Sequence, residues 1–163
     1  MSTQLSHRVQ RIKPSPTLAV SAKAAALKAQ GIDVISLGAG EPDFDTPLHI
    51  KQAAINAINA GFTKYTAVEG TLDLRKAIAA KFAGDNQLMY EPNQILVSCG
   101  GKQSFFNLAQ AYLNSGDEVI IPAPYWVSYP DMAYLAKAKP VIIDTDIDAQ
   151  FKITPKKKKK AIT

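Results

Sequence analysis

The chain has 163 residues, about the length of one ordinary domain, and at 47% hydrophobic it has enough apolar side chains to bury a core. No apolar run is long enough to span a membrane, the N-terminal MSTQLSHRVQRIKP lacks the apolar segment of a secretory signal, and the single cysteine, Cys99, excludes an internal disulfide framework. The net charge of +5 comes from Lys152 and Lys156–Lys160, since residues 1–151 carry 13 basic and 14 acidic side chains, so the body offers no nucleic-acid surface.

The first third of the chain alternates between irregular and helical patterns. Residues 1–14 form an irregular basic arm, and an alanine-rich helix is expected at 17–30, where Gly31 is placed to end it. A short strand is expected at 33–38, followed by the turn-rich connector EPDFDTP. Thr46 is the expected N-cap of the next helix, with Pro47 as its first residue and Gly61 at its end.

The remainder alternates helices with strands. A helix carrying Leu74–Phe82 is expected to end at Gly84; after it we expect strands at 95–98, 118–122 and 140–144 and helices at 101–113 and 125–137. This alternation predicts an α/β fold, with three α/β/α layers and a mostly parallel sheet. Ligands bind beyond the carboxyl ends of the strands in such sheets, which directs attention to the loops after Leu37, Val97 and Pro122.

The stretch CGGKQS, which joins strand 95–98 to the following helix, has the pattern of a phosphate site. A helix N-terminus presents unpaired N–H groups and the positive end of the helix dipole, and Gly100 and Gly101 leave the backbone bare. The alternative is a tight turn in which the glycines only supply unusual dihedral angles. The stretch is not a nucleotide-binding P-loop, because the spacing differs.

Trp126, the only tryptophan, follows the next strand in PAPYWVSYP. An indole at that strand end is placed to stack on a flat heteroaromatic ring, although most single tryptophans are core residues. A phosphate site and an aromatic platform at neighbouring strand ends together indicate a phosphorylated aromatic ligand, either pyridoxal phosphate or a nucleotide.

Five stretches in this order and spacing carry a family resemblance: RIKPSPTLAVSAKA, ISLGAGEPDFDTP, TKYTAVEGTLDLRKAIA, SCGGKQSFFNL and GDEVIIPAPYWVSYP. With them the chain resembles the N-terminal part of a class I aminotransferase, in the aspartate aminotransferase branch of the fold-type I pyridoxal-phosphate enzymes. The resemblance runs from about residue 8 to residue 145.

The resemblance implies cofactor-binding roles for five residues. Gly100, Gly101 and Lys102 match the segment whose backbone holds the phosphate of pyridoxal 5'-phosphate, and Trp126 matches the aromatic residue that stacks on its ring. Tyr65 matches a tyrosine that reaches the cofactor phosphate of the neighbouring subunit, which implies a homodimer with shared active sites.

The same resemblance implies substrate-binding roles. Gly40 matches the glycine whose backbone lies near the substrate α-carboxylate, with Trp126 beside it, and Lys102 is expected to pair with a distal carboxylate. Ser15 and Thr17 match a segment that folds over the substrate. For these last assignments the alternatives are an exposed lysine and an ordinary helix N-cap.

The expected reaction is pyridoxal-phosphate-dependent transamination, most simply L-aspartate and 2-oxoglutarate giving oxaloacetate and L-glutamate. In this reading residues 1–46 are an N-terminal arm with a segment of the small domain, and residues 47–163 are the first part of the cofactor-binding large domain. The catalytic lysine of the family lies downstream, so this chain holds no catalytic residue and resembles the first two-fifths of an enzyme. The isolated chain is expected to be inactive.

Other readings remain open. The amino acid specificity is alternatively for prephenate or aromatic substrates, and the fold is alternatively a non-catalytic remnant. Cys99 stands where a thiol hydrolase would carry its nucleophile, with only His7 and His49 as possible bases. The lysine run is read as a solvated helix start, or as a localisation or polyanion-binding tract. The one cysteine fits a reducing compartment, so we expect a cytoplasmic protein, and we identify no metal-ligand set.

Overall fold

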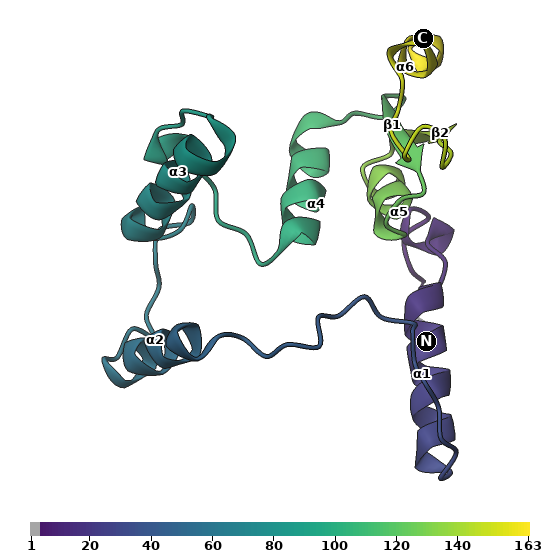
Figure 1. Cartoon of the computed structure of the whole chain (residues 1–163). Helices are drawn as coiled ribbons and strands as arrows, with labels where there is room; N and C mark the ends of the chain where they lie inside the picture. Colours follow the sequence, from purple (N-terminus) through teal and green to yellow (C-terminus); the bar gives the residue numbers. More distant parts are fainter. Residues whose placement is uncertain (1–3) are drawn as a thin grey trace. The chain divides into compact units, whose positions relative to one another are not determined.

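The computed structural model describes residues 4–163, which divide into two compact units. The first combines the N-terminal residues through Gly38 with Gly100–Thr163, and the second is Ala39–Cys99. Figure 1 shows the helices and strands of each unit. The predicted division at residues 46 and 47 concerns the domains of a complete enzyme and stays a prediction.

The first unit is built around two parallel strands. Its elements in chain order are η1 Val9–Arg11, α1 Pro16–Ala29, α4 Gly101–Tyr112, β1 Glu118–Ala123, α5 Ser128–Leu135, β2 Lys139–Asp144 and α6 Pro155–Ala161. Strands β1 and β2 pair in parallel, with Glu118 opposite Lys139 and Ala123 opposite Asp144. The predicted strands at 118–122 and 140–144 and their parallel pairing are therefore confirmed.

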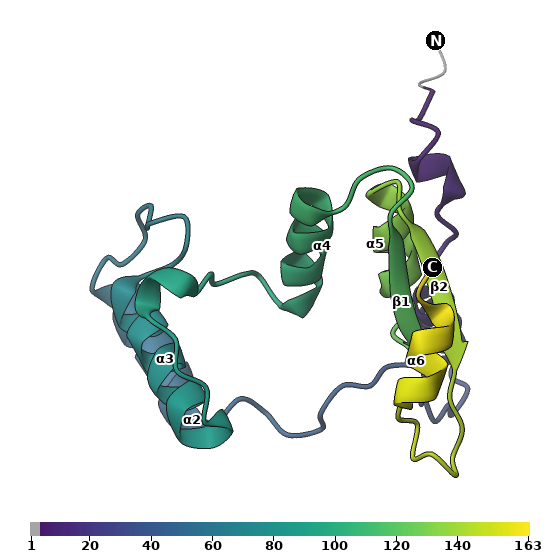
Figure 2. The same cartoon turned by 90° about the horizontal axis from the view of Figure 1, so that it is seen from above.

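Helix α5 connects the two strands and packs on them, as Figure 2 shows. Small residues make this close approach possible, because Ala133 on the helix and Ala138 before β2 are both buried. Ile121 of β1, Ile143 of β2 and Met132 of α5 are buried as well. Burying such side chains stabilises the unit by roughly 1.5–3 kcal/mol each.

The second unit contains α2 Leu48–Asn59, α3 Leu72–Asn86 and the short η2 Pro92–Gln94. Arg75 of α3 holds its loops together, since its guanidinium donates to the carbonyl oxygens of Gly70 at 3.2 Å and Pro92 at 3.0 Å and pairs with Glu69 at 3.4 Å. Only 11% of the Arg75 side chain is exposed, so these bonds are shielded from water. The backbone N–H of Val97 adds a bond to Glu69 O at 3.0 Å.

Two predicted strands, 33–38 and 95–98, are not strands in this structure. A strand is defined by a ladder of hydrogen bonds to a neighbour, and neither segment has such a ladder within residues 4–163. Ile95 is nevertheless buried, as a strand residue would be, whereas Leu37 is almost fully exposed. The apolar pattern of these two segments predicted strands but did not supply the neighbouring strand that each would need.

Several predicted helix ends are shifted. Helix α2 begins at Leu48 with Pro47 as its N-cap, because Pro47 is extended, with φ −52° and ψ 141°; Thr46 is not the cap. Helix α3 continues through Gly84 to Asn86 and ends where Gln87 takes the left-handed conformation. The predicted ends of α1 and α2 are confirmed, since Gly31 and Gly61 follow them with φ of 80° and 76°.

The lysine run forms most of α6, which confirms its reading as a solvated helix start. Thr154 caps the helix by accepting a bond from the Lys157 N–H at 3.3 Å, and Lys158–Lys160 occupy the last turn, where the helix dipole favours positive charge. No helix among the described residues has the length and apolar character needed to cross a membrane.

Two glycines of the second unit predict opposite stability effects in the full-length protein. Gly70 has φ +100°, and a Cβ there would lie 2.7 Å from Val97 Cγ2, so we expect Gly70→Ala to lower the free energy of unfolding by about 2–4 kcal/mol. Gly84 lies within helix α3, and a Cβ built on it meets no atom of residues 4–163 within 4 Å, so Gly84→Ala should raise the free energy of unfolding by about 1 kcal/mol. Denaturant unfolding of both variants measures these changes. Changes of the same sign and size in the two variants would contradict the structure.

The ion pair between Glu118 and Lys139, at the start of β1 and β2, predicts that the stability of the protein depends on pH. The Lys139 ammonium, 2.7 Å from the Glu118 carboxylate, and the Thr163 hydroxyl lower the pKa of Glu118, and the same ion pair raises the pKa of Lys139. The stabilisation is therefore present at neutral pH. It is lost as pH falls through the lowered pKa of Glu118, and as pH rises through the raised pKa of Lys139.

In the full-length protein, Glu118→Gln should lower the melting temperature slightly at neutral pH, because the pair is exposed. The difference from the parent protein should vanish at acid pH, below the lowered pKa of Glu118, and at alkaline pH, above the raised pKa of Lys139, because one partner is then uncharged. Thermal unfolding across this range measures the difference. A difference that is constant with pH would show that the ion pair does not stabilise the strands.

Candidate functional site

The glycine joint forms the N-terminus of α4 in the first unit. Gly100 is the N-cap, and its carbonyl oxygen accepts the N–H groups of Gln103 at 3.1 Å and Ser104 at 3.4 Å. The N–H groups of Gly101 and Lys102 precede these and have no acceptor within the helix. The N-cap residue itself, being glycine, has no side chain with which to cap this helix. The arrangement suits an anion that accepts from the backbone.

The two glycines of this joint are explained differently. Gly100 has φ 87° and ψ 164°, a conformation that L side chains rarely adopt, so the turn itself requires glycine there. Gly101 has no such φ, and a Cβ built on it meets no described atom within 4 Å. Because the local fold does not require glycine at position 101, its bare backbone and the open space beside it fit a bound phosphate.

Trp126 and Lys102 lie together, although 24 positions separate them in the sequence. The Nζ of Lys102 stands 4.8 Å from the centroid of the Trp126 ring, a cation–π contact that joins the start of α4 to the turn after β1. Trp126 is 44% exposed, so the alternative of a core tryptophan is wrong for this structure. The geometry places a partly open aromatic face beside the helix N-terminus.

The turn that carries Trp126 is held by backbone and ring contacts. It follows β1 through the cis peptide Ala123–Pro124, and the Trp126 carbonyl oxygen accepts the N–H of Tyr129 at 3.1 Å. The Tyr129 ring meets Phe105 of α4 edge to face, with centroids 5.0 Å apart. Helix α5 therefore begins at Ser128 rather than at the predicted residue 125, because residues 124–127 form this turn.

Ser15 and Thr17 lie at the start of α1. The Ser15 hydroxyl accepts the N–H of Leu18 at 3.4 Å, so Ser15 is a helix N-cap, which was the alternative to its substrate role. Ser15 also lines an open groove of ≈ 680 Å³ within the first unit, together with Tyr125 and Arg11. Thr17 does not line this groove. The substrate roles of both residues stay predictions.

Gly40 and Tyr65 belong to the second unit, whereas the glycine joint at the start of α4 belongs to the first. Tyr65 is fully exposed. A Cβ on Gly40 would meet none of the described atoms within 4 Å, and its φ is not positive, so nothing local requires glycine there. Their predicted contacts with substrate and cofactor phosphate remain predictions.

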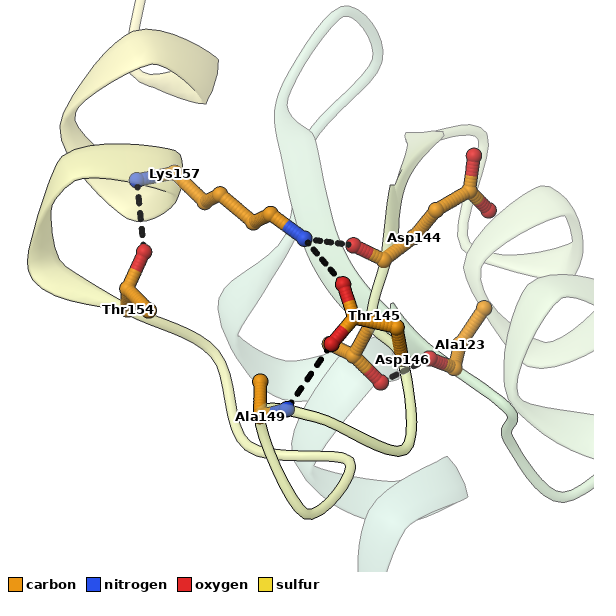
Figure 3. A network of polar contacts seen from close by, with 7 residues as sticks. All are labelled: Ala123, Asp144, Thr145, Asp146, Ala149, Thr154 and Lys157. Carbon is orange, nitrogen blue, oxygen red and sulfur yellow. Dashed lines mark hydrogen bonds and ion pairs between the residues drawn. The ribbon is translucent and has the colours of Figure 1, made fainter.

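Sequence reasoning missed a polar network at the carboxyl ends of the strands, which Figure 3 shows. Thr145 donates both its N–H and its hydroxyl to the carbonyl oxygen of Ala123. Lys157 reaches Asp144 O at 2.9 Å and Asp146 Oδ2 at 3.4 Å. The N–H of Ala149, with Lys157 as a weaker influence, lowers the pKa of Asp146. The sequence feature that could have predicted this network is the polar run that directly follows the predicted strand 140–144.

No group of three or more metal-ligating side chains occurs within residues 4–163. The residues brought together in the first unit are therefore a backbone anion site, an aromatic ring and a lysine. This set fits a ligand with a phosphate and a flat ring better than it fits a metal ion.

The chain is similar to proteins of known family. Residues 32–163 match the family described as aminotransferase class I and II. An aspartate/prephenate aminotransferase from Nitrosomonas europaea is 67% identical over 160 residues, covering 98% of this chain and 40% of the relative. An aspartate aminotransferase from Bacillus sp. is 53% identical over 163 residues, covering 100% of this chain and 42% of the relative.

A solved structure of aspartate aminotransferase from Thermus thermophilus with maleate is 49% identical, with a TM-score of 0.95 over 99% of this chain and 42% of that one. This likeness, together with the parallel strand pair, confirms the predicted α/β fold class. The chain spans about 40% of the length of the curated relatives it matches. Since the family match covers most of its residues, the chain belongs to the class I and II aminotransferases.

Proposed function

We propose that this chain is part of a pyridoxal-phosphate-dependent transaminase that converts L-aspartate and 2-oxoglutarate into oxaloacetate and L-glutamate. The observation that carries the proposal is the Lys102–Trp126 contact at the glycine-bearing start of α4. Relatives over 50% identical carry aspartate aminotransferase names, which supports the substrate assignment.

The cofactor phosphate would be held by the start of α4. The N–H groups of Gly101 and Lys102 donate to its oxygens, and the positive end of the helix dipole favours its charge. The open space at Gly101 lets those oxygens approach the backbone. When bound, pyridoxal phosphate supplies the electron sink for amino-group transfer.

Trp126 and Lys102 would then orient the ring and the substrate. The half-exposed indole offers a flat apolar face that excludes water from one side of the cofactor ring. The Lys102 ammonium, which lies over this ring at 4.8 Å from its centroid, is placed to form a charge-assisted bond with the distal carboxylate of a dicarboxylic substrate. The Thermus thermophilus enzyme was solved with maleate, which is such a dicarboxylate, and this supports the role.

The second unit would contribute the remaining contacts. Gly40 offers a bare backbone to the substrate α-carboxylate, and the fully exposed Tyr65 is available to reach the cofactor phosphate of a second subunit. We therefore propose a homodimer with shared active sites. The catalytic lysine would come from the rest of the protein, so the isolated 163-residue chain would be inactive. We place the enzyme in the cytoplasm.

Prephenate is a second candidate substrate. The relative from Nitrosomonas europaea, at 67% identity, is named for both aspartate and prephenate. Prephenate also carries two carboxylates, so the same Lys102 contact would serve it. An aromatic specificity and a non-catalytic remnant are less favoured, and the family membership gives no support to a thiol hydrolase based on Cys99.

The direct test is a transamination assay of the full-length protein. With pyridoxal phosphate, L-aspartate and 2-oxoglutarate, we expect formation of oxaloacetate, followed in a coupled malate dehydrogenase assay. Prephenate as the amino acceptor tests the second candidate. An intact, cofactor-loaded protein that exchanges no amino group between any of these pairs would refute the proposed function.

Lys102→Met tests how the enzyme recognises its substrate. Because methionine keeps much of the length of the side chain and removes its charge, we expect kcat/KM for aspartate to fall about 10- to 100-fold, the range for one hydrogen bond to a charged group. The value for phenylalanine, which has no distal carboxylate, should change less than about threefold. Equal losses for both substrates would assign Lys102 to the cofactor alone.

A further inference from the structure

The last carbonyl oxygen of β1 is bonded twice by one residue. Ala123 O accepts the backbone N–H of Thr145 at 3.1 Å, which continues the parallel ladder beyond Asp144, and it also accepts the Thr145 hydroxyl. A carbonyl oxygen has two lone pairs, so Thr145 uses both. Figure 3 shows the threonine reaching across from the end of β2 to Ala123.

This carbonyl lies just before the turn that presents Trp126. Ala123 precedes Trp126 by three positions, and the Trp126 carbonyl is in turn fixed by the Tyr129 N–H at 3.1 Å. The Trp126 ring is half exposed, so packing alone does not determine where it lies. Its position depends on the backbone at both ends of the turn, and Thr145 fixes the end nearer β1.

Thr145 is itself held on both sides. Lys157 donates to the carbonyl oxygen of Asp144, which precedes it, and pairs with the carboxylate of Asp146, which follows it. Asp146 also accepts the Ala149 N–H at 2.8 Å, so the loop after β2 is closed on itself. Lys157 is half-buried, whereas the other lysines of the run are exposed. One lysine of the run thus has a structural task that its neighbours do not share.

We propose that Thr145 is a positioning residue that acts through Trp126: its hydroxyl, braced by Lys157, fixes the end of β1 and thereby the ring platform. This inference rests on the proposed function, in which Trp126 stacks on the cofactor. Thr145 touches neither cofactor nor substrate. Removing its hydroxyl would loosen the platform while leaving the backbone N–H bond of the ladder in place.

The test uses the full-length holoenzyme in its pyridoxamine phosphate form, in which the cofactor is not covalently attached. The variants are Thr145→Val, which removes the hydroxyl at nearly constant volume, and Thr145→Ser, which keeps it. Thr163→Val is the matched control, because the Thr163 hydroxyl bonds Glu118 at the opposite end of β1, at 3.1 Å. Trp126→Ala is combined with Thr145→Val. The readout is the dissociation constant of pyridoxamine phosphate.

We expect Thr145→Val to raise this dissociation constant about 3- to 10-fold, the range for one hydrogen bond. Thr145→Ser and Thr163→Val should stay within about twofold of the parent enzyme. In the Trp126→Ala background, Thr145→Val should have no further effect, because the residue through which it acts is gone. If Thr145→Val does not fold, Lys157→Met takes its place, with the same expected direction and the same loss of effect without Trp126.

Two outcomes would overturn this inference while leaving the proposed function intact. One is a Trp126→Ala enzyme with weakened cofactor binding beside a Thr145→Val enzyme that binds normally. The other is full additivity of the two substitutions, which would mean that Thr145 acts on stability rather than through the platform. If Trp126→Ala itself leaves cofactor binding unchanged, the stacking role in the proposed function fails first, and the inference falls with it.

Discussion

The parallel pairing of β1 and β2 is the constraint on which the first unit depends. Parallel strands end at the same edge, so the turn after Ala123 and the loop after Asp144 must lie side by side. The α5 crossover, buried through Ala133 and Met132, holds the two strands in this register. Without the pairing, neither the Trp126 turn nor the loop carrying Thr145 would have a fixed place.

The pairing by itself does not make a ligand site, because the start of α4 must also reach the Trp126 turn. Two contacts supply this connection. The Phe105 and Tyr129 rings pack edge to face, and Lys102 lies over the Trp126 ring. Both contacts join the N-terminal part of α4 to the start of α5 or to the turn just before it. The helix N-terminus and the aromatic ring therefore come from different parts of the chain but are aligned by packing that is independent of any ligand.

Elements defined by local pattern were predicted from the sequence, whereas those that depend on distant partners were not. Helices α1 and α4 and strands β1 and β2 have clear local signals and were predicted within a few residues. Residues 33–38 and 95–98 have the composition of strands, but a strand needs a neighbour, which composition does not specify. In the site, the helix N-terminus and Trp126 were predicted together; the network of Thr145 and Lys157 was not, because it joins side chains whose partners are set only by the register.

The glycines show most clearly what a structure adds to a motif. In the sequence, Gly100 and Gly101 are equivalent, and either an unusual dihedral or a ligand explains both. In the structure, Gly100 has the positive φ and Gly101 has the unexplained bare backbone. The two explanations therefore divide between the residues, one for each. Because the turn requires glycine only at position 100, the second glycine is the stronger indication of a bound anion, and the positive end of the α4 dipole points to the same place.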